Sequence, residues 1–311
     1  MSKALICGSL AYDTIMVFED HFVNHILPNQ IHKLNVSFFV PSMRREFGGV
    51  AGNIAYNLKL MGGEPVPMGT VGQDFVPYAQ HLQELDISLE GVLYKDDMFT
   101  PQAFITTDKD NNQITAFHPG AMSLSHECKV SEHTDVSIGI VGPDGREGMI
   151  THAKGFVKNN IPFIFDPGQA MPLFDGEDLK SFINQATWMA VNDYEYELVC
   201  ERTGWDAREI ATHLKALIVT RGEKGSEIYT DGTVYHIPVV EAKNIKDPTG
   251  CGDAYRAGLL FGLTKGLDMQ TTGRIASLLG SIKIAHAGTQ NHSFNRDEFD
   301  DLFEKEFGYR F

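Results

Sequence analysis

The chain has 311 residues, 42% of them hydrophobic, which is enough to bury a large core and argues against a disordered protein. Its 26 Lys and Arg residues against 41 Asp and Glu residues give a net charge of −15, which argues against a nucleic acid or an anionic membrane as the main partner. The four cysteines are scattered and form no C-x-x-C pair, so neither a zinc site nor a disulfide framework is indicated. Without a readable targeting signal or an apolar run of membrane-spanning length, a reducing cytoplasm is the expected location.

The first predicted strand covers residues 4–7, and Asp13 follows shortly after its end. Open α/β sheets bind ligands just beyond the carboxyl ends of their strands, so Asp13 is a candidate ligand-binding residue, with a plain surface Asp as the alternative. Short strand-like pieces without a helical stripe fill residues 15–40, including 31–40. They predict a small sheet that projects from the main body.

A glycine-rich segment leads into the next predicted helix. Gly48 and Gly49 precede Asn53, and apolar residues then recur at helical spacing up to Met61. The glycines either permit close packing of the helix on the sheet, which the residues alone favour, or leave Asn53 to offer its amide to a ligand hydroxyl.

Residues 102–107 and 113–118 flank a cluster of polar turn residues and predict a β-hairpin. Phe104 and Phe117 lie on its two arms. They are ordinary core candidates, or, if the hairpin joins the earlier strand pieces in one lid, stacking surfaces for a planar ring.

Strands and helices alternate along the chain, most regularly from about residue 135, which is typical of a mostly parallel sheet with helices on both faces. The predicted strands beyond the hairpin are residues 65–71, 137–141, 162–166, 188–191, 217–220, 226–230, 233–237 and 241–245. The predicted helices are residues 75–85, 147–158, 178–185, 194–201, 207–213, 254–263, 275–286 and 297–303.

Two neighbouring strand ends carry polar or glycine-rich segments. Asn192 and Glu195 follow one strand, and Thr220, Gly222 and Gly225 follow the next. The first pair is either a helix N-cap with an acidic first turn or a set of oxygen ligands for a hydrated Mg²⁺. The second is either a plain turn or a loop that gives a nucleotide phosphate access to the backbone.

Residues 247–253, with the sequence DPTGCGD, form a tight loop that leads into a helix. Unpaired amides at a helix N-terminus favour an anion, and Gly250 and Gly252 let a phosphate come close to the backbone. Asp253 is then either a first-turn residue that complements the helix dipole or a general base beside a transferring phosphoryl group. The loop alone leaves both interpretations open.

These motifs, in this order across almost the whole chain, resemble those of the ribokinase-type (PfkB) carbohydrate and nucleoside kinases, and most closely those of bacterial adenosine kinases. The resemblance implies a single three-layer α/β/α domain over residues 1–311, with a β-sheet lid formed by inserted segments at about 14–45 and 98–120. It implies phosphorylation of the 5′-hydroxyl of adenosine by ATP, giving AMP and ADP, with Mg²⁺ and K⁺ as expected cofactors. Adenosine and ATP would be its small-molecule partners.

The resemblance also assigns roles to residues of this sequence. Asp253 would be the general base, beside an anion hole made by Gly250, Cys251 and Gly252. The acceptor would be held by Asp13, Ser37, Gly48, Gly49 and Asn53, with the purine sandwiched between Phe104 and Phe117. The ATP side would use Asn192, Thr220, Gly222 and Gly225, with Glu195 reaching Mg²⁺ through water and Asp247 near a monovalent cation.

Cys251 departs from the small apolar residue that is usual in such an anion hole. It is either a buried small hydrophobic group or an oxidation-sensitive point. Two other functions stay open: a kinase for another nucleoside or for a simple sugar such as ribose or fructose, and a non-catalytic nucleoside-binding protein. A homodimer formed by pairing of lid strand edges is a further expectation, and the alternative is that each edge is covered within one chain.

Overall fold

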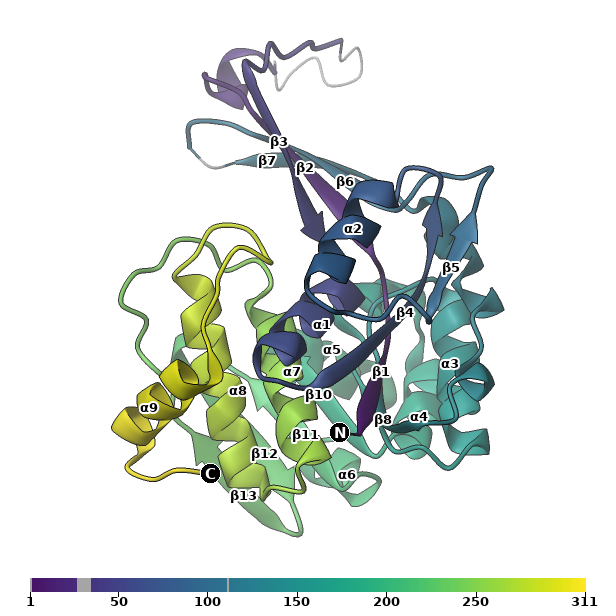
Figure 1. Ribbon diagram of the computed structural model, residues 1–311, viewed down its shortest axis with the longest axis vertical. Coiled ribbons are helices and arrows are strands. Elements are labelled where there is room, and N and C mark those ends of the chain that lie inside the picture. Colours follow the sequence, from purple (N-terminus) through teal and green to yellow (C-terminus); the bar gives the residue numbers. More distant parts are fainter. Residues whose placement is uncertain (1, 27–34, 111) are drawn as a thin grey trace.

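The computed structural model describes residues 2–26, 35–110 and 112–311 (Figure 1). Within them the main sheet has nine strands in the order β13-β12-β11-β10-β9-β8-β1-β4-β5. The strands are β1 Lys3–Cys7, β4 Glu64–Gly72, β5 Val92–Lys95, β8 Val136–Val141, β9 Phe163–Phe165, β10 Trp188–Asn192, β11 Ala216–Thr220, β12 Ser226–Thr230 and β13 Thr233–Ile237. All neighbours pair in parallel except β12, which is antiparallel to β11 and β13.

Helices cover both faces of this sheet. They are α1 Val50–Leu60, α2 Val76–Glu84, α3 Arg146–Lys158, α4 Gly176–Gln185, α5 Asp193–Thr203, α6 Ala207–Thr212, α7 Cys251–Thr264, α8 Met269–Ile284 and α9 Arg296–Phe307. Short 3₁₀ turns cover Phe22–Asn24, Gly120–Glu127, Val130–Glu132, Gly168–Leu173 and Gly222–Lys224. Successive strand residues point to opposite faces, so Ile6 packs in one apolar cluster with α1, α7 and α8, and Leu5 packs in a second with α3 to α6. The three-layer α/β/α arrangement predicted from the sequence is thereby confirmed.

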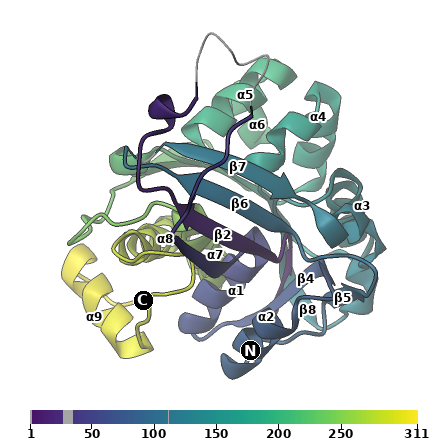
Figure 2. The same cartoon turned by 90° about the horizontal axis from the view of Figure 1, so that it is seen from above.

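A separate sheet of four strands stands above the main body (Figure 1). Its order is β3-β2-β6-β7, with β2 Ala11–Val17, β3 Ser42–Gly48, β6 Gln102–Thr107 and β7 Gln113–His118. Seen from above, this lid sheet lies over α1, α7 and α8 (Figure 2). The predicted hairpin is thus confirmed, and β2 follows β1 so closely that one chain segment links the main sheet to the lid.

The lid strands differ from the prediction at one place. The strand expected at residues 31–40 is wrong where it can be checked: residues 35–40 lie outside any strand, and residues 31–34 fall outside the described part of the chain. The strand forms instead at β3, where Gly48 pairs with Ala11 and each following pair continues the ladder with β2. Pairing with a distant strand, which local composition does not encode, decided its position.

Other differences concern element ends. Residues 241–245, expected as a strand, form an irregular loop, and the main sheet ends at β13. The helix expected from residue 275 begins at Met269, where the Asp268 side chain accepts a hydrogen bond from the Thr271 amide and caps it. Strand β5 was not predicted.

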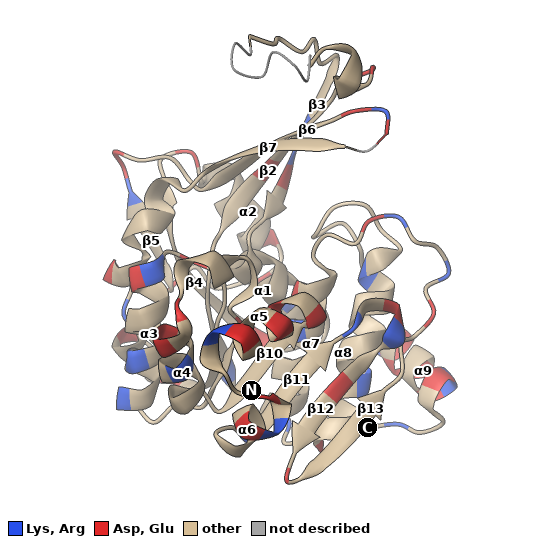
Figure 3. Ribbon diagram, turned by 180° about the vertical axis from the view of Figure 1, so that it is seen from behind, with Lys and Arg blue, Asp and Glu red and all other residues tan. Residues whose placement is uncertain are grey.

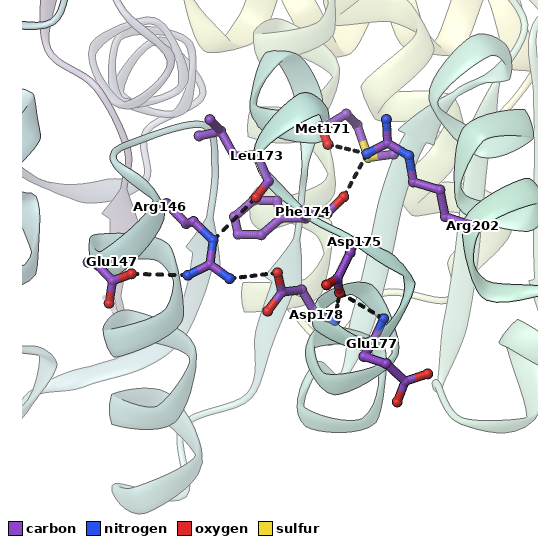
Figure 4. A network of polar contacts seen from close by, with 9 residues as sticks. All are labelled: Arg146, Glu147, Met171, Leu173, Phe174, Asp175, Glu177, Asp178 and Arg202. Atoms are coloured by element: carbon purple, nitrogen blue, oxygen red, sulfur yellow. Dashed lines mark hydrogen bonds and ion pairs between the residues drawn. The ribbon is translucent and has the colours of Figure 1, made fainter.

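Two arginines anchor the segment that leaves β9 (Figure 4). Arg202 donates to the carbonyl oxygens of Met171 and Phe174 at 2.5 and 2.7 Å, and Arg146 donates to the carbonyl of Leu173 at 3.2 Å. The same Arg146 pairs with Asp178 at 2.7 Å. The chain that follows the carboxyl end of β9 is therefore held against α3, α4 and α5.

On the side shown in Figure 3, Lys and Arg alternate with Asp and Glu along the helices, so positive charge is not gathered into one stripe there. In the described residues, no helix has both the length and the apolar character needed to cross a membrane.

Candidate active site

The base of the lid and the start of α7 meet at Asn53. Its Nδ2 donates to Asp253 Oδ2 at 2.7 Å, and its Oδ1 accepts from Gln290 Nε2 at 3.0 Å. Gln290 Nε2 also lies 2.7 Å from the Tyr78 hydroxyl, which donates to the carbonyl of Gly48 at 2.7 Å. This chain of hydrogen bonds fixes the orientation of the Asn53 amide and, through it, of the Asp253 carboxyl group. Gln290 and Tyr78 were not predicted as site residues, because they lie far from Asn53 in sequence.

The Asp253 carboxyl group is tuned by its surroundings. Burial raises its pKa to about 7, with a further upward contribution from Asp166, while the hydrogen bond from Asn53 and the charge of Arg256 act in the opposite direction. A carboxylate whose pKa lies near neutrality can accept a proton from a substrate hydroxyl and release it again. The pKa of Asp253 therefore suits the role of general base that the sequence analysis predicted for it.

Asp13 lies on β2, on the lid side of the site. Burial raises its pKa to about 6, and the carboxylates of Glu46 and Asp247 add to this. Gly48 faces it so closely that a Cβ there would lie 2.6 Å from Asp13 Oδ2. The glycine therefore leaves room for the carboxylate, which is well placed for a ligand that donates hydrogen bonds.

Gly49 serves packing, as the residues alone favoured. It begins α1 with φ of 81°, and a Cβ there would lie 2.5 Å from the carbonyl oxygen of Ser9. The first amides of α1 already have partners, since Val50 donates to the Ser9 hydroxyl and Ala51 to the Ser9 carbonyl. Two of the first amides of α1 are thus satisfied within the protein, whereas two successive amides at the start of α7 have no acceptor in the described chain.

The helix α7 begins after Gly250, whose φ of 79° turns the chain into the helix. The Cys251 amide donates to the carbonyl of Pro248 at 3.2 Å, and the Ala254 amide donates to that of Gly250 at 2.9 Å. Between them, within the described chain, the amides of Gly252 and Asp253 have no hydrogen-bond acceptor. These two free donors at a helix N-terminus form an anion-binding position.

The side chain of Cys251 points back into this loop, with Sγ 4.0 Å from the carbonyl oxygen of Asp247. Burial raises the pKa of the thiol to about 11. Because the thiolate is the reactive form, the geometry favours a small buried group over an oxidation-sensitive one.

The two polar strand ends meet as expected, since Asn192 pairs with Thr220 in the parallel ladder of β10 and β11. Asn192 Oδ1 accepts from the Glu195 amide, and Glu195 Oε2 accepts from the Asn192 amide, both at 2.8 Å. This capping box confirms the N-cap interpretation. Burial raises the pKa of Glu195, and repulsion from Asp166 adds to the effect, so a cation nearby would stabilise the charged form. Carboxylate and amide oxygens at this strand edge therefore fit a hydrated Mg²⁺.

A buried ion pair behind these groups was missed at the sequence level. Arg256 Nε and Nη2 donate to the two oxygens of Asp166 at 3.0 and 3.2 Å, and Nη2 also donates to the carbonyl of Ala190 at 3.2 Å. The same Nη2 lies 3.9 Å from Glu195 Oε2. Arg256 and Asp166 are only 5% and 4% exposed. The available signal was an arginine inside the otherwise apolar helix after the DPTGCGD loop.

The glycine turn after β11 has two different glycines. Gly225 has φ of 81°, and a Cβ there would lie 2.1 Å from the carbonyl oxygen of Ile237. Gly222 has φ of 55° with open space around it. The structure explains Gly225 by packing against the end of β13, and it leaves Gly222 on the accessible side of the turn, next to Thr220.

The pairing register of the lid strands argues against the expected sandwich of a purine between Phe104 and Phe117. Asp13 pairs with Ala103, which pairs with Phe117, whereas Phe104 pairs with Thr14 on one side and Ala116 on the other. Paired residues share a face of the sheet and successive residues alternate. Phe117 therefore lies on the face that carries Asp13, and Phe104 lies on the opposite face, so one lid cannot clamp a single ring between both.

Ser37 does not join the other site residues. It lies exposed in the segment before β3, outside any strand, and within the described residues no hydrogen bond connects it to the site. Its predicted substrate contact stays a prediction.

The carboxylate and the carbonyl oxygen of Asp247 both have partners within the protein. The amides of Thr249 and Gly288 donate to the Asp247 carboxylate, both at 2.9 Å. Burial works against the charged form, yet these two hydrogen bonds hold the pKa of Asp247 below its usual range. The Lys283 Nζ, meanwhile, donates to the carbonyl oxygen of Asp247 at 2.8 Å. An ammonium group of the protein therefore lies at this loop, and the bound monovalent cation expected beside Asp247 stays a prediction.

Comparison with known proteins defines the class. The sequence profile of the pfkB family carbohydrate kinases matches residues 5–296. The chain therefore belongs to the pfkB family carbohydrate kinases, in agreement with the fold and with the two-sided site described above. The ribokinase of Thermotoga maritima, 20% identical with a TM-score of 0.81 over 98% of this chain and 100% of its own, shares the fold.

Nearer relatives are nucleoside kinases. The chain is 34% identical to the nucleoside kinase of Methanocaldococcus jannaschii over 87% of this chain and 90% of that protein. It is 52% identical to the Burkholderia thailandensis nucleoside kinase in complex with inosine, with a TM-score of 0.90 and 99% of each chain covered. The same Burkholderia enzyme in complex with ADP-inosine is 54% identical, with a TM-score of 0.87 over 99% of this chain and 97% of that one.

Proposed function

We propose that this protein phosphorylates the 5′-hydroxyl of purine nucleosides with ATP, and that adenosine and inosine are both acceptors. The observation that carries the proposal is the junction of Asp253 with two free amides at the start of α7, directly beside the Asn53 group at the base of the lid. Adenosine is the acceptor that the resemblance to adenosine kinases implies. Inosine is the ligand of the relative that is 52% identical.

On the acceptor side, the Asp13 carboxylate accepts hydrogen bonds from the ribose hydroxyls, and Asn53 holds the sugar beside Asp253. The Phe117 ring stacks on the purine from the lid. Asp253 takes the proton of the 5′-hydroxyl as that oxygen attacks the terminal phosphorus of ATP, and the bond from that phosphorus to the bridging oxygen of ADP breaks. The products are the nucleoside 5′-monophosphate and ADP.

On the phosphate side, the amides of Gly252 and Asp253 stabilise negative charge on the transferred group. Glu195 and Asn192 would hold Mg²⁺ through water, and the ion would neutralise the ATP phosphates. Thr220 and the accessible Gly222 turn border the nucleotide. Arg256 keeps Asp166 and Glu195 from adding uncompensated negative charge to this end of the site.

A panel of acceptors tests the proposal. Release of ADP from Mg·ATP is measured with adenosine, inosine, guanosine, cytidine, ribose and fructose at matched concentrations. We expect kcat/KM to be largest for the purine nucleosides. A preference for ribose or fructose would make the protein a sugar kinase, and nucleoside binding without ADP release would make it a non-catalytic binding protein.

The homodimer through the lid edges stays a prediction, which sedimentation with and without nucleoside checks.

A further inference from the structure

Lys283 lies in the last turn of α8 and is fully buried, with 0% of its surface exposed. Its Nζ donates to two backbone carbonyl oxygens, that of Asp247 at 2.8 Å and that of His286 at 3.2 Å. No carboxylate oxygen of the described residues lies within salt-bridge distance of it. A buried ammonium bonded to carbonyls in place of a carboxylate is an uncommon arrangement, since burying a charge without an ion-pair partner is costly.

The surroundings compensate the charge collectively. The carbonyl end of α8 carries the negative end of the helix dipole. Burial lowers the pKa of Lys283, whereas Asp247, Cys251 and Asp253 all act to raise it. Backbone carbonyls with a nearby carboxylate are also the groups that replace the hydration shell of a desolvated monovalent cation. The ammonium therefore occupies a position whose chemistry suits such an ion.

This position joins two loops. The amides of Lys246 and Asp247 donate to the carbonyl of Ile284 at 2.9 and 3.2 Å, and the Gly288 amide donates to the Asp247 carboxylate at 2.9 Å. Lys283 adds the bond to the Asp247 carbonyl, three residues before Gly250 opens α7. Its charge thus holds the chain that supplies the free amides of Gly252 and Asp253.

We propose that the Lys283 ammonium is a tethered replacement for the monovalent cation expected at this loop, so that the enzyme reaches full activity without K⁺. Lys283 is a positioning residue: it acts on the transferred phosphoryl group through the backbone of residues 247–253. The expectation that Asp247 borders a bound K⁺ is thereby revised. The activity measurement rests on the proposed kinase function, whereas the melting-temperature measurement does not.

The test compares the wild-type protein with Lys283→Met, which keeps an apolar stem and removes the charge. Kinase activity and melting temperature are measured in choline, Na⁺ and K⁺ chloride at constant ionic strength. We expect the wild-type protein to be indifferent to the cation. The variant should lose about 5- to 150-fold in kcat in choline, the range of a typical coupling between two sites, and should recover both kcat and melting temperature in K⁺.

Leu279→Ala is the matched control, because Leu279 is buried one turn earlier on the same face of α8. It should lower the melting temperature equally in all three salts. If wild-type activity required K⁺, or if Lys283→Met gained nothing from K⁺ in either readout, Lys283 would be only a cap on α8 and the inference would fail. Inactivity of the wild-type protein toward every acceptor would refute the kinase proposal, and the melting temperatures would still decide the role of Lys283.

Discussion

The phosphate end and the lid end of the site are built differently. At the phosphate end, Arg256 and Asp166 are buried and paired, and the half-buried Glu195 lies 3.9 Å from the same Arg256. At the lid end, every residue of β7 is exposed, including Phe117, which is 52% exposed. The groups proposed to handle phosphate are thus fixed by contacts within the protein, whereas the groups proposed to contact the base have exposed side chains.

The two ends also compensate their acidic residues differently. Asp166 and Glu195 have Arg256 beside them, while Asp13 lies near the further carboxylates of Glu46 and Asp247 and forms no ion pair within the described residues. An unpaired carboxylate near other carboxylates is a good acceptor for hydroxyl donors. The comparison therefore predicts that damage to the phosphate end impairs chemistry or folding, and that damage to the lid end impairs acceptor binding alone.

The largest effect is expected from Asp253→Asn. The amide keeps the size of the side chain but cannot accept the proton of the acceptor, so kcat should fall by about 10²- to 10⁴-fold. Nucleoside affinity, measured by calorimetry, should change little. A variant with near-normal turnover would remove Asp253 from the role of general base.

Next in size is the loss of the buried cation in Arg256→Met. Removal of Arg256 leaves Asp166 buried without its ion-pair partner, so the free energy of unfolding should drop by about 3–5 kcal/mol in urea titrations. The double variant Arg256→Met with Asp166→Leu should regain part of that loss. If the double variant were as unstable as the single one, the pair would not be the cause.

An exposed arginine provides the control for this experiment. Arg146 pairs with Asp178 at 2.7 Å, but its side chain is 41% exposed (Figure 4). Since solvent screens such a pair, Arg146→Met should cost about 1 kcal/mol or less. Equal losses from Arg146→Met and Arg256→Met would contradict the contrast between buried and exposed pairs.

At the lid end, the two phenylalanines should behave unequally. Phe117→Ala should raise KM for a purine nucleoside by about 5- to 150-fold, because stacking of a base on an aromatic ring is worth about 1–3 kcal/mol. Phe104→Ala, on the opposite face, should change KM little, and kcat should hold in both. Equal effects of the two substitutions would restore the sandwich that the register argues against.

The smallest effect is on stability as a function of pH. The pKa of Asp253 is raised in the folded protein to about 7, so the folded state holds an extra proton between the ordinary pKa of an aspartate and about pH 7. The stability contributed by this residue is therefore lost as pH rises through that window. Asp253→Asn should melt at a higher temperature than wild type at pH 8, and the difference should shrink toward pH 4. A constant difference across this range would argue against the raised pKa.

Local sequence patterns predicted much of the fold of this protein. The alternation of apolar strands and helices predicted the mostly parallel sheet. The glycine loops predicted where α1 and α7 begin, and the strand ends after β10 and β11 predicted a shared edge where Asn192 pairs with Thr220. These features depend on residues close together in the chain, and glycine, proline and capping side chains act within a few residues of themselves.

Tertiary structure decided the features that depend on distant partners. The pairing of β2 with β6 determined which face carries Phe117 and which carries Phe104. Arg256 is hydrogen-bonded to Asp166, which lies 90 residues away in the sequence, and Lys283 is hydrogen-bonded to the Asp247 carbonyl, 36 residues away. Strand register and the partners of buried charges follow from how the whole core packs, and no local pattern of residues encodes them.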